Sequence, residues 1–571
     1  METFAILSAR DLLHEESSPE RCEELLRGIP FQALVQYASV FCHNLTVAGE
    51  SGAGSQKLFE FHDQFVRNHA SVPFYEHLKT LLSHRRAYRG KDWALTDEHR
   101  VASLVLAYAR ANVALPPGET GRQHLDRLLH AQLVVNDLVS LPTEGPLEEL
   151  PVATVLRSFA MARAWNARST MPRGFNVMVA GLLKSMPEIA GEVRAYAGVD
   201  LEEIAIVLFG LYLNLFGAVP GVPWAEGQPK PRWSRGLLDL SKLGLRHSGE
   251  AVMRTVFDKY ARPWDDLYAV AAGILHADPS IVPLFDRPLI RTGGEQVWCF
   301  DPGMVLNAAT LGLAFLAARA HEAAQHEGQA VFSALGHAFE AYLALFFQEA
   351  GCHDVQRGDE QREGLSDFYL LEGDTLIAIE AKASLMRDDA KWSGDEKRIR
   401  GELQKLVKDN QLMKAIARKL ESDPNLRGRV TRVVPVFVVL DPVFACPGLE
   451  PEVIAAVAKP DVAVGVEDPH LLFVGALETA GNYLREGLFS KLLDARRAVA
   501  GTGWVGLDEL IGRYKTRIEA ALGGWLEPFD AHVGTRADLN TAMREFWLRH
   551  GGAAGGPPGI TPDKVGQREV D

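Results

Sequence analysis

The residues with the clearest potential for chemistry are two carboxylates and a lysine within the segment 366–382. Asp367 stands at the start of one strand-like run, and Glu380 and Lys382 stand near the end of the next. Carboxylate oxygens are the ligands that Mg²⁺ prefers, and a lysine beside them can orient a water molecule or offset the charge of a phosphate. These residue types therefore indicate metal-assisted hydrolysis if the fold brings the three side chains together.

A tight hairpin would bring them together. The two runs are separated only by Gly373 and Asp374, a connection that favours a two-residue turn. Such a turn sets Asp367 opposite Glu380, and facing residues point to the same side of a sheet. Lys382, two residues further along, emerges on that side as well. Because like charges that face each other destabilise a sheet, the pattern predicts a compensating divalent cation.

A third carboxylate lies in the predicted helix 333–350, whose residues are mostly apolar or aromatic. Glu340 stands in the middle of this helix, among Phe339, Leu343 and Phe347. An ionised carboxylate in such surroundings is unfavourable unless it is paired or bound to a metal. We therefore expect Glu340 to supply a third oxygen ligand.

A basic, helix-like segment follows the hairpin at 396–420. Its residues Gln404 and Gln411 lie seven apart, on one helix face. The stretch 391–432 holds twelve Lys or Arg against six Asp or Glu, a local surplus of six positive charges. Such a surface suits phosphate contacts, and a solvated helix face explains it equally well. The apolar run 430–440 then predicts a strand at the centre of a mixed sheet.

The order of these elements resembles the PD-(D/E)XK nuclease superfamily. A helix with a Glu precedes a strand with an Asp, a strand with Glu-x-Lys, a helix with a Gln and an apolar strand. The resemblance covers residues 285–500 and rests on Glu340, Asp367, Glu380, Ala381, Lys382 and Gln411. Ser366 stands where the superfamily often has a proline.

The resemblance implies an α/β fold in the C-terminal half, with a restriction-endonuclease-like mixed sheet flanked by helices. It implies that Asp367 and Glu380, together with the Ala381 carbonyl and Glu340, hold one or two Mg²⁺ ions. Mn²⁺ is the expected substitute. These are hard oxygen ligands of the kind that both ions accept.

The resemblance also implies roles for the two remaining residues. Lys382 would orient or deprotonate the attacking water, and Gln411 would position Lys382 or a phosphate oxygen. The implied activity is that of a metal-dependent endonuclease that hydrolyses phosphodiester bonds, with DNA as the expected substrate and prokaryotic defence or repair as the expected setting. Two alternatives remain open: a nuclease-fold subunit for binding or assembly without catalysis, and a structural protein with an accidental charge cluster.

Length and composition indicate several globular domains. The chain has 571 residues, of which 47% are hydrophobic and 23% are charged. Residues 1–280 are mainly helical in pattern, and we expect them to sense a small molecule or to dock a partner or nucleic acid. The nuclease-like domain is predicted at 281–500, a helical extension at 501–550 and a disordered tail, rich in Gly and Pro, at 551–571.

Charge and cysteine content limit the partners and the compartment. A formal charge of -14 argues against a protein that coats nucleic acid or an anionic membrane over its whole surface. Nucleic acid would have to be met at one face, and a partner protein or a second copy could close a channel around it. The five cysteines are scattered and odd in number, which favours the reducing cytoplasm. The N-terminus lacks the pattern of a signal peptide.

Two further segments have features that could mislead. The apolar run 204–219 is shorter than the roughly 17 to 25 residues that span a bilayer, so we expect a buried core helix and no membrane partner. The motif from His321 to His326 is similar to a zinc protease helix, which however requires histidines four residues apart. Five residues turn about 500° around a helix, so we expect these imidazoles to diverge on a solvated helix end.

Overall fold

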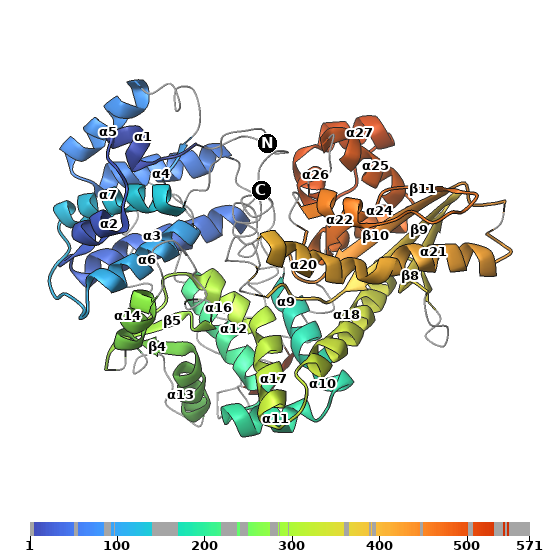
Figure 1. The fold of residues 1–571 in the computed structure, drawn as a ribbon, viewed down its shortest axis with the longest axis horizontal. Coiled ribbons are helices and arrows are strands. Elements are labelled where there is room, and N and C mark those ends of the chain that lie inside the picture. The colour runs from blue at the N-terminus through green and yellow to red at the C-terminus, as the bar shows by residue number, and fades with distance from the viewer. Residues whose placement is uncertain are drawn as a thin grey trace.

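The computed structural model has a helical N-terminal half and a C-terminal half built around a mixed sheet (Figure 1). The structure describes residues 5–50, 55–84, 93–95, 98–139, 170–217, 237–239, 249–273, 284, 286–294, 296–358, 365–387, 390, 396–426, 428–445, 449–500, 506–529, 541–542 and 545–546. The predicted tail at 551–571 lies outside these residues.

The C-terminal sheet is of mixed direction, as predicted. Its strands are β7 (Gln356–Arg357), β8 (Phe368–Glu372), β9 (Thr375–Lys382), β10 (Arg432–Val439), β11 (Gly465–Val466) and β12 (His470–Phe473). Strands β7, β8 and β9 are antiparallel neighbours, whereas β10 runs parallel to β9 on one side and to β11 and β12 on the other. The apolar run 430–440 is therefore a central strand, and β10 is buried along nearly its whole length.

Helices cover both faces of this sheet. Ile377 and Ile379 of β9 point into a core shared with α18 (Gln329–Glu349). Leu376 and Ala378 point to the opposite face, into a core shared with α20 (Glu396–Val407) and α21 (Gln411–Ser422). Figure 1 shows α20 and α21 crossing in front of the sheet and α18 running below it. Because side chains alternate along β9, Glu380 and Lys382 lie on the same face as Leu376 and Ala378.

The prediction of one helix over 396–420 is wrong, because the structure has two helices there, separated by a break. A short 3-10 turn, Lys408–Asn410, separates α20 from α21. Lys408 and Asn410 both have positive φ angles, 31° and 62°, and Asn tolerates this region better than most residues. The Asn410 side chain donates a hydrogen bond of 2.6 Å to the carbonyl oxygen of Ala458. As a result Gln404 is exposed while Gln411 is half-buried, so they share no common face.

The apolar segment 302–323 is divided into two helices. α16 (Pro302–Ala309) and α17 (Leu311–Ala323) meet at a bend of 48°. The Thr310 hydroxyl donates to the carbonyl oxygen of Leu306 at 2.8 Å, a bond that is often found where helices bend. By length and composition, the described helices include one that could cross a membrane, α18, or two if this bent pair counts as one span.

The N-terminal half forms its own core. Its helices are α1 (Ala9–Leu13), α2 (Pro19–Leu26), α3 (Phe31–Glu50), α4 (Ser55–His69), α5 (Val72–His84), α6 (Glu98–Ala111) and α7 (Arg122–Val139). Strands β1 (Ala5–Ile6) and β2 (Trp93–Ala94) pair in parallel. The buried residues of these helices form one hydrophobic cluster with residues further along the chain, including Trp264, Trp298 and Met304. The core of this half is thus completed by later residues.

A second group of early helices belongs to the C-terminal core. It comprises α9 (Thr170–Phe175), a π-helical turn (Asn176–Gly181), α10 (Leu182–Ser185), α11 (Ile189–Ala197) and α12 (Leu201–Gly217). Buried residues of these helices join one cluster with α16, α17, α18 and one face of the sheet. The expected core helix in 204–219 is confirmed for residues 204–212, whose described side chains are almost all buried. The domain boundary at residue 280 stays a prediction, and both hydrophobic cores run across it.

The remaining elements connect these cores. Strands β3 (Leu237–Asp239), β6 (Gln296–Trp298), β5 (Leu289–Gly293) and β4 (Ala261–Pro263) form a sheet in that order. Helices α13 (Gly249–Tyr260) and α14 (Trp264–Gly273) flank β4. After β10 come α22 (Glu450–Ala456), α23 (Val474–Thr479), α24 (Gly481–Arg485), α25 (Phe489–Ala500), α26 (Leu507–Arg513) and α27 (Lys515–Leu522).

Candidate active site

The predicted hairpin is confirmed, including its register. Glu372 pairs with Thr375 across the turn, and Phe368 pairs with Ile379 at the other end of the ladder. Gly373 adopts a φ of 62° in the turn, a conformation that glycine reaches without strain. The hairpin thus has the two-residue connection from which the positions of the charged residues were predicted.

Asp367 lies directly beyond the last ladder pair, beside the end of β9. Its Oδ2 accepts a hydrogen bond of 2.7 Å from the backbone N–H of Ala381. In an antiparallel ladder the N–H and C=O of one residue point toward the same neighbouring strand. The Ala381 carbonyl therefore faces the side on which Asp367 lies, as a metal ligand would have to.

Glu380 and Lys382 form a buried ion pair next to Asp367. The Lys382 Nζ donates to Glu380 Oε1 at 2.7 Å. Glu380 is only 2% exposed, and the Lys382 side chain is 14% exposed. The second carboxylate oxygen, Glu380 Oε2, is buried with no hydrogen-bond partner among the described residues. Buried polar atoms are nearly always satisfied, so this oxygen is available to a cation or a water molecule.

The electrostatics of Asp367 show that three carboxylates converge here. Burial, and then the charges of Glu380 and Glu340, raise the pKa of Asp367 to about 8. The Ala381 N–H and the Lys382 ammonium oppose this shift and are outweighed. We name Glu340, Asp367 and Glu380 the carboxylate cluster.

Glu340 approaches the cluster from α18, as predicted. Its side chain is 27% exposed, and Arg357 Nη2 lies 4.0 Å from its Oε2. Gln411 lies at the first position of α21, which packs over β9. In the described part of the chain, its side chain makes no hydrogen bond with Lys382. The structure therefore places Gln411 on the expected face without showing the expected contact.

Two supporting residues were not identified from the sequence. Asp441 follows β10 and is fully buried, and its carboxylate accepts hydrogen bonds from the N–H groups of Met386 and Val443, at 3.0 and 3.1 Å. It thereby fixes the segment that leaves β9 after Lys382. Its position directly after an apolar central strand is the sequence feature by which Asp441 could have been identified.

Tyr369 is the second supporting residue. Its hydroxyl accepts a hydrogen bond of 2.9 Å from the Ser366 N–H and lies 3.4 Å from the carbonyl oxygen of Ala415 in α21. These contacts fasten the start of the hairpin to the helix that covers it. The position two residues after Asp367, on the same strand face, was the available signal.

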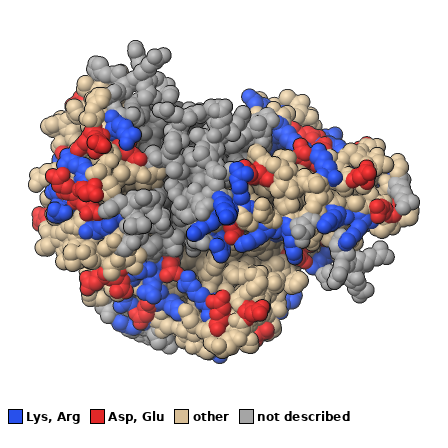
Figure 2. Space-filling view, viewed as in Figure 1, with Lys and Arg blue, Asp and Glu red and all other residues tan. Residues whose placement is uncertain are grey.

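The helices over this face of the sheet carry a basic surface. Figure 2 shows Lys and Arg side chains gathered over α20 and α21. The exposed basic residues of the segment 396–422 are Lys397, Arg398, Arg400, Lys405, Lys408, Lys414 and Arg418. Arg400 pairs with Glu452 and Lys405 with Glu402, so part of this charge is neutralised locally.

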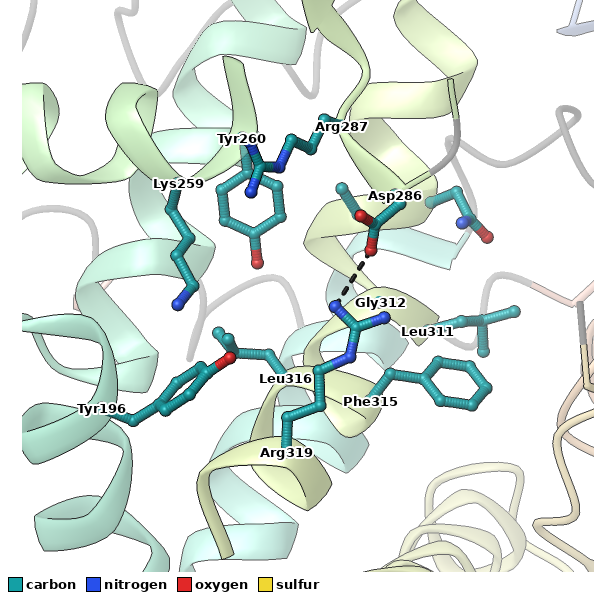
Figure 3. Close-up of a pocket in the computed structure, with 12 residues that line it drawn as sticks. Tyr196, Lys259, Tyr260, Asp286, Arg287, Leu311, Gly312, Phe315, Leu316 and Arg319 are labelled. Carbon is teal, nitrogen blue, oxygen red and sulfur yellow. Dashed lines mark hydrogen bonds and ion pairs between the residues drawn. The ribbon is translucent and has the colours of Figure 1, made fainter. Parts of the chain in front are cut away.

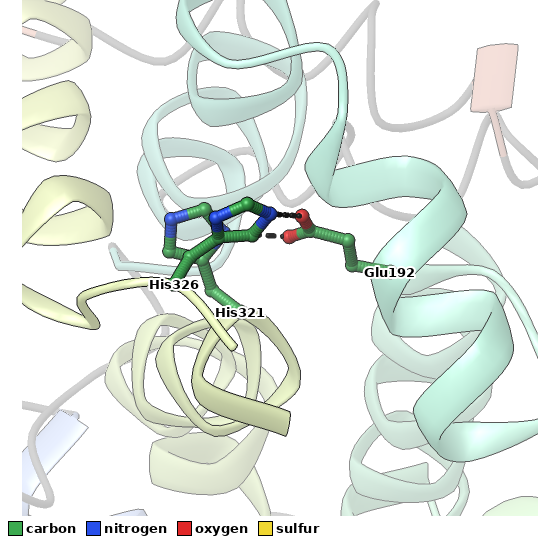
Figure 4. A group of neighbouring side chains, drawn as sticks. All are labelled: Glu192, His321 and His326. Carbon is green, nitrogen blue, oxygen red and sulfur yellow. Dashed lines mark hydrogen bonds and ion pairs between the residues drawn. The ribbon is translucent and has the colours of Figure 1, made fainter. Parts of the chain in front are cut away.

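The expectation for His321 and His326 is wrong, because their imidazoles do not diverge. The rings stack with centroids 4.6 Å apart, and both face the carboxylate of Glu192 (Figure 4). α17 ends at Ala323, and Gln325, with a φ of 68°, turns the chain back so that His326 returns over the helix. His321 is buried and not solvated. Two histidines and a carboxylate form a set that suits Zn²⁺ better than Mg²⁺.

Comparisons with protein-family models, curated proteins and solved structures find no match for this chain. The observed architecture is α/β, with helices throughout and mixed sheets in the C-terminal half. Any assignment of function therefore depends on the geometry of the carboxylate cluster and its surroundings.

Proposed function

We propose that this protein is a metal-dependent nuclease that hydrolyses phosphodiester bonds, with DNA as its substrate. The observation that carries the proposal is the buried Glu380, whose Oε2 lacks a partner among the described residues while Asp367 and Glu340 crowd beside it. Three carboxylates crowded beside Lys382 are costly to fold without a further cation. A divalent cation would compensate this charge.

The donor set fits Mg²⁺. Asp367, Glu380 and the Ala381 carbonyl would hold the ion, and Glu340 would complete the site or hold a second ion. All are oxygen donors, the type that Mg²⁺ and Mn²⁺ prefer. When bound, such an ion polarises a phosphate oxygen and lowers the pKa of a bound water.

The remaining chemistry belongs to the side chains. Lys382 is held by Glu380 yet retains partial exposure, so its ammonium has two further N–H groups to offer a water or a phosphate oxygen. Gln411, half-buried at the start of α21, is proposed to position such a group. Both residues then act by orienting the attacking water and offsetting the charge of the phosphate.

Membership of the PD-(D/E)XK superfamily is part of the proposal. It is supported by the order of α18, β8, β9, α21 and β10 and by the antiparallel hairpin joined to a parallel central strand. The restriction-endonuclease-like fold is proposed on the same ground. Cytoplasmic location is proposed from the cysteines, because the four that the structure describes are buried and form no disulfide.

DNA is proposed as the partner because of the basic surface on α20 and α21. These helices cover the sheet face on which Glu380 and Lys382 emerge, so the basic surface lies on the same side of the sheet as these two residues. The overall charge of -14 limits binding to such a face. A second copy or a partner protein that completes the channel is therefore part of the proposal, as is a role in prokaryotic defence or repair.

The test is cleavage of plasmid and of short single- and double-stranded DNA and RNA, with Mg²⁺ or Mn²⁺. We expect metal-dependent cutting that is lost in Asp367→Asn and Lys382→Ala. Asp461→Asn and Lys491→Ala are matched controls, because both side chains are exposed in the same half of the chain. Cutting that persists in Asp367→Asn would refute the site.

If the wild type does not cut, the effect of Mg²⁺ on its stability is the second measurement. If Mg²⁺ stabilises the wild type and Asp367→Asn abolishes this effect, the site binds metal and requires an activator. If Mg²⁺ has no effect on wild-type stability, the proposed activity is wrong, and the alternative of a nuclease-fold binding subunit takes its place.

A further inference from the structure

A second polar site lies between helices α11, α13 and α17 (Figure 3). It is a pocket of about 170 Å³. Tyr196 comes from α11, Lys259 and Tyr260 from the end of α13, and Arg319 from α17. The segment before β5 adds Asp286 and Arg287. None of these residues belongs to the carboxylate cluster, so the pocket is a separate site.

Positive charge dominates this pocket. Its lining includes three cations, Lys259, Arg287 and Arg319, and one carboxylate, Asp286, which leaves two positive charges in excess. Asp286 pairs with Arg319 at 3.0 Å. The Lys259 ammonium lies 3.7 Å from the ring centroid of Tyr196, a cation–π contact that leaves its charge in place.

The charge of Arg287 also acts on the neighbouring Arg262. Burial first, and then the charge of Arg287, lower the pKa of Arg262 from its ordinary value. Burial raises the pKa of Tyr260, so its hydroxyl stays protonated and can donate a hydrogen bond. The potential and the available donors both favour an anionic ligand.

The polar groups converge on one space. In Figure 3 the Lys259 ammonium and the hydroxyls of Tyr260 and Tyr196 lie around one space, and the Arg319 guanidinium, paired with Asp286, borders it. Ammonium, guanidinium and phenol groups are hydrogen-bond donors, and guanidinium offers paired N–H groups that match a phosphate. The polar part of the lining thus offers mainly donors and positive charge, beside the Asp286 carboxylate and the Asn307 amide, and Ala308, Leu311, Gly312, Phe315 and Leu316 form its apolar part.

We propose that this pocket binds the phosphate group of a small phosphomonoester. A phosphate dianion balances the two excess charges and can accept hydrogen bonds from several of the convergent donors at once. A cavity of about 150 Å³ holds a molecule of benzene size, so the pocket admits a phosphate with a short stem. Tyr196, 38% exposed, stands where the rest of the ligand would leave the pocket. The proposal does not depend on the nuclease activity.

The walls of the pocket are held in place without ligand. Glu192 of α11 contacts His321 of α17 at 2.7 Å and His326 at 3.6 Å. Tyr196 lies one helical turn after Glu192, and Arg319 lies two residues before His321. This contact therefore fixes the two helices that carry opposite walls, and a preformed site binds its ligand at a smaller entropic cost.

The test is isothermal titration of the full-length protein with inorganic phosphate and with glycerol 3-phosphate, at pH 8 and constant ionic strength. EDTA is present so that no metal recruits phosphate to the carboxylate cluster. We expect saturable binding by the wild type. Because a hydrogen bond to a charged group contributes strongly, Lys259→Met and Arg319→Gln should each weaken binding about tenfold or more.

Arg194→Gln is the matched control, since Arg194 lies on the same α11, is exposed and pairs with Asp200 outside the pocket. It should bind as the wild type does. Circular dichroism shows whether each variant is folded, and Tyr196→Phe, which removes only a hydroxyl, provides a milder change. Absence of binding by the wild type, or equal binding by folded Lys259→Met and the control, would overturn the proposal.

Discussion

The raised pKa of Asp367 leads to a quantitative prediction about the metal-free protein. In the folded chain this pKa is about 8, against an ordinary value of 3.8. Between these values the unfolded chain has released the proton that the folded chain retains. Stability must therefore fall as the pH rises from about 4 to 8, by about 1.4 kcal/mol per pH unit, and level off above 8.

The variant Asp367→Asn isolates this contribution. Asn cannot ionise, and its side-chain oxygen can still accept the hydrogen bond from the Ala381 N–H. The difference in unfolding free energy between wild type and variant cancels the titration of other groups. Relative to the variant, the metal-free wild type should lose about 2 to 3 kcal/mol between pH 6 and pH 8.

The assay is denaturant unfolding in EDTA at pH 6, 7 and 8. Asp461→Asn, an exposed substitution of the same kind, should show no such pH dependence. A difference between wild type and Asp367→Asn that stays constant over this range would refute the argument. It would mean that the three carboxylates do not interact as the structure indicates.

Three further predictions concern the pH dependence of Mg²⁺ binding, a buried ion pair and the break between α20 and α21. Mg²⁺ should bind about tenfold more weakly at pH 7 than at pH 9 by calorimetry, because a proton competes at Asp367; equal affinities would contradict this. Glu478→Ala should cost about 3 to 5 kcal/mol in unfolding experiments, because it leaves the buried Arg173 unpaired; a loss below 1 kcal/mol would contradict it. Asn410→Ala should lower stability by about 1 to 2 kcal/mol, through its positive φ and the lost bond to Ala458. Asn410→Gly should cost less, and the reverse order would contradict the role of φ.

The hairpin and its charged residues were predictable because they depend on short-range rules. A two-residue turn fixes the register, and the register fixes which side chains face each other. Asp367, Glu380 and Lys382 therefore lie where the alternation along the strands predicted. The central strand β10 was predictable for a similar reason, since an apolar run of that length must be covered on both faces.

The errors have a common physical cause. The break at Lys408–Asn410 and the turn at Gln325 both depend on residues that adopt a positive φ, which residue periodicity does not show. After the turn at Gln325, His326 no longer follows helical geometry, so the angular argument that separated it from His321 did not apply. Contacts with Glu192, far away in the sequence, then decided where the rings lie.

The hydrophobic core shared across residue 280 limits how this protein can be divided. Helices α9 to α12 pack against α16, α17 and α18, and Arg173 of α9 is buried in an ion pair with Glu478 of α23. A chain that began at residue 281 would expose the apolar faces of α16 to α18 and would lose the guanidinium that Glu478 requires. The C-terminal half is thus no exchangeable module. In recombination between genes, it would have to be inherited together with residues 170–217.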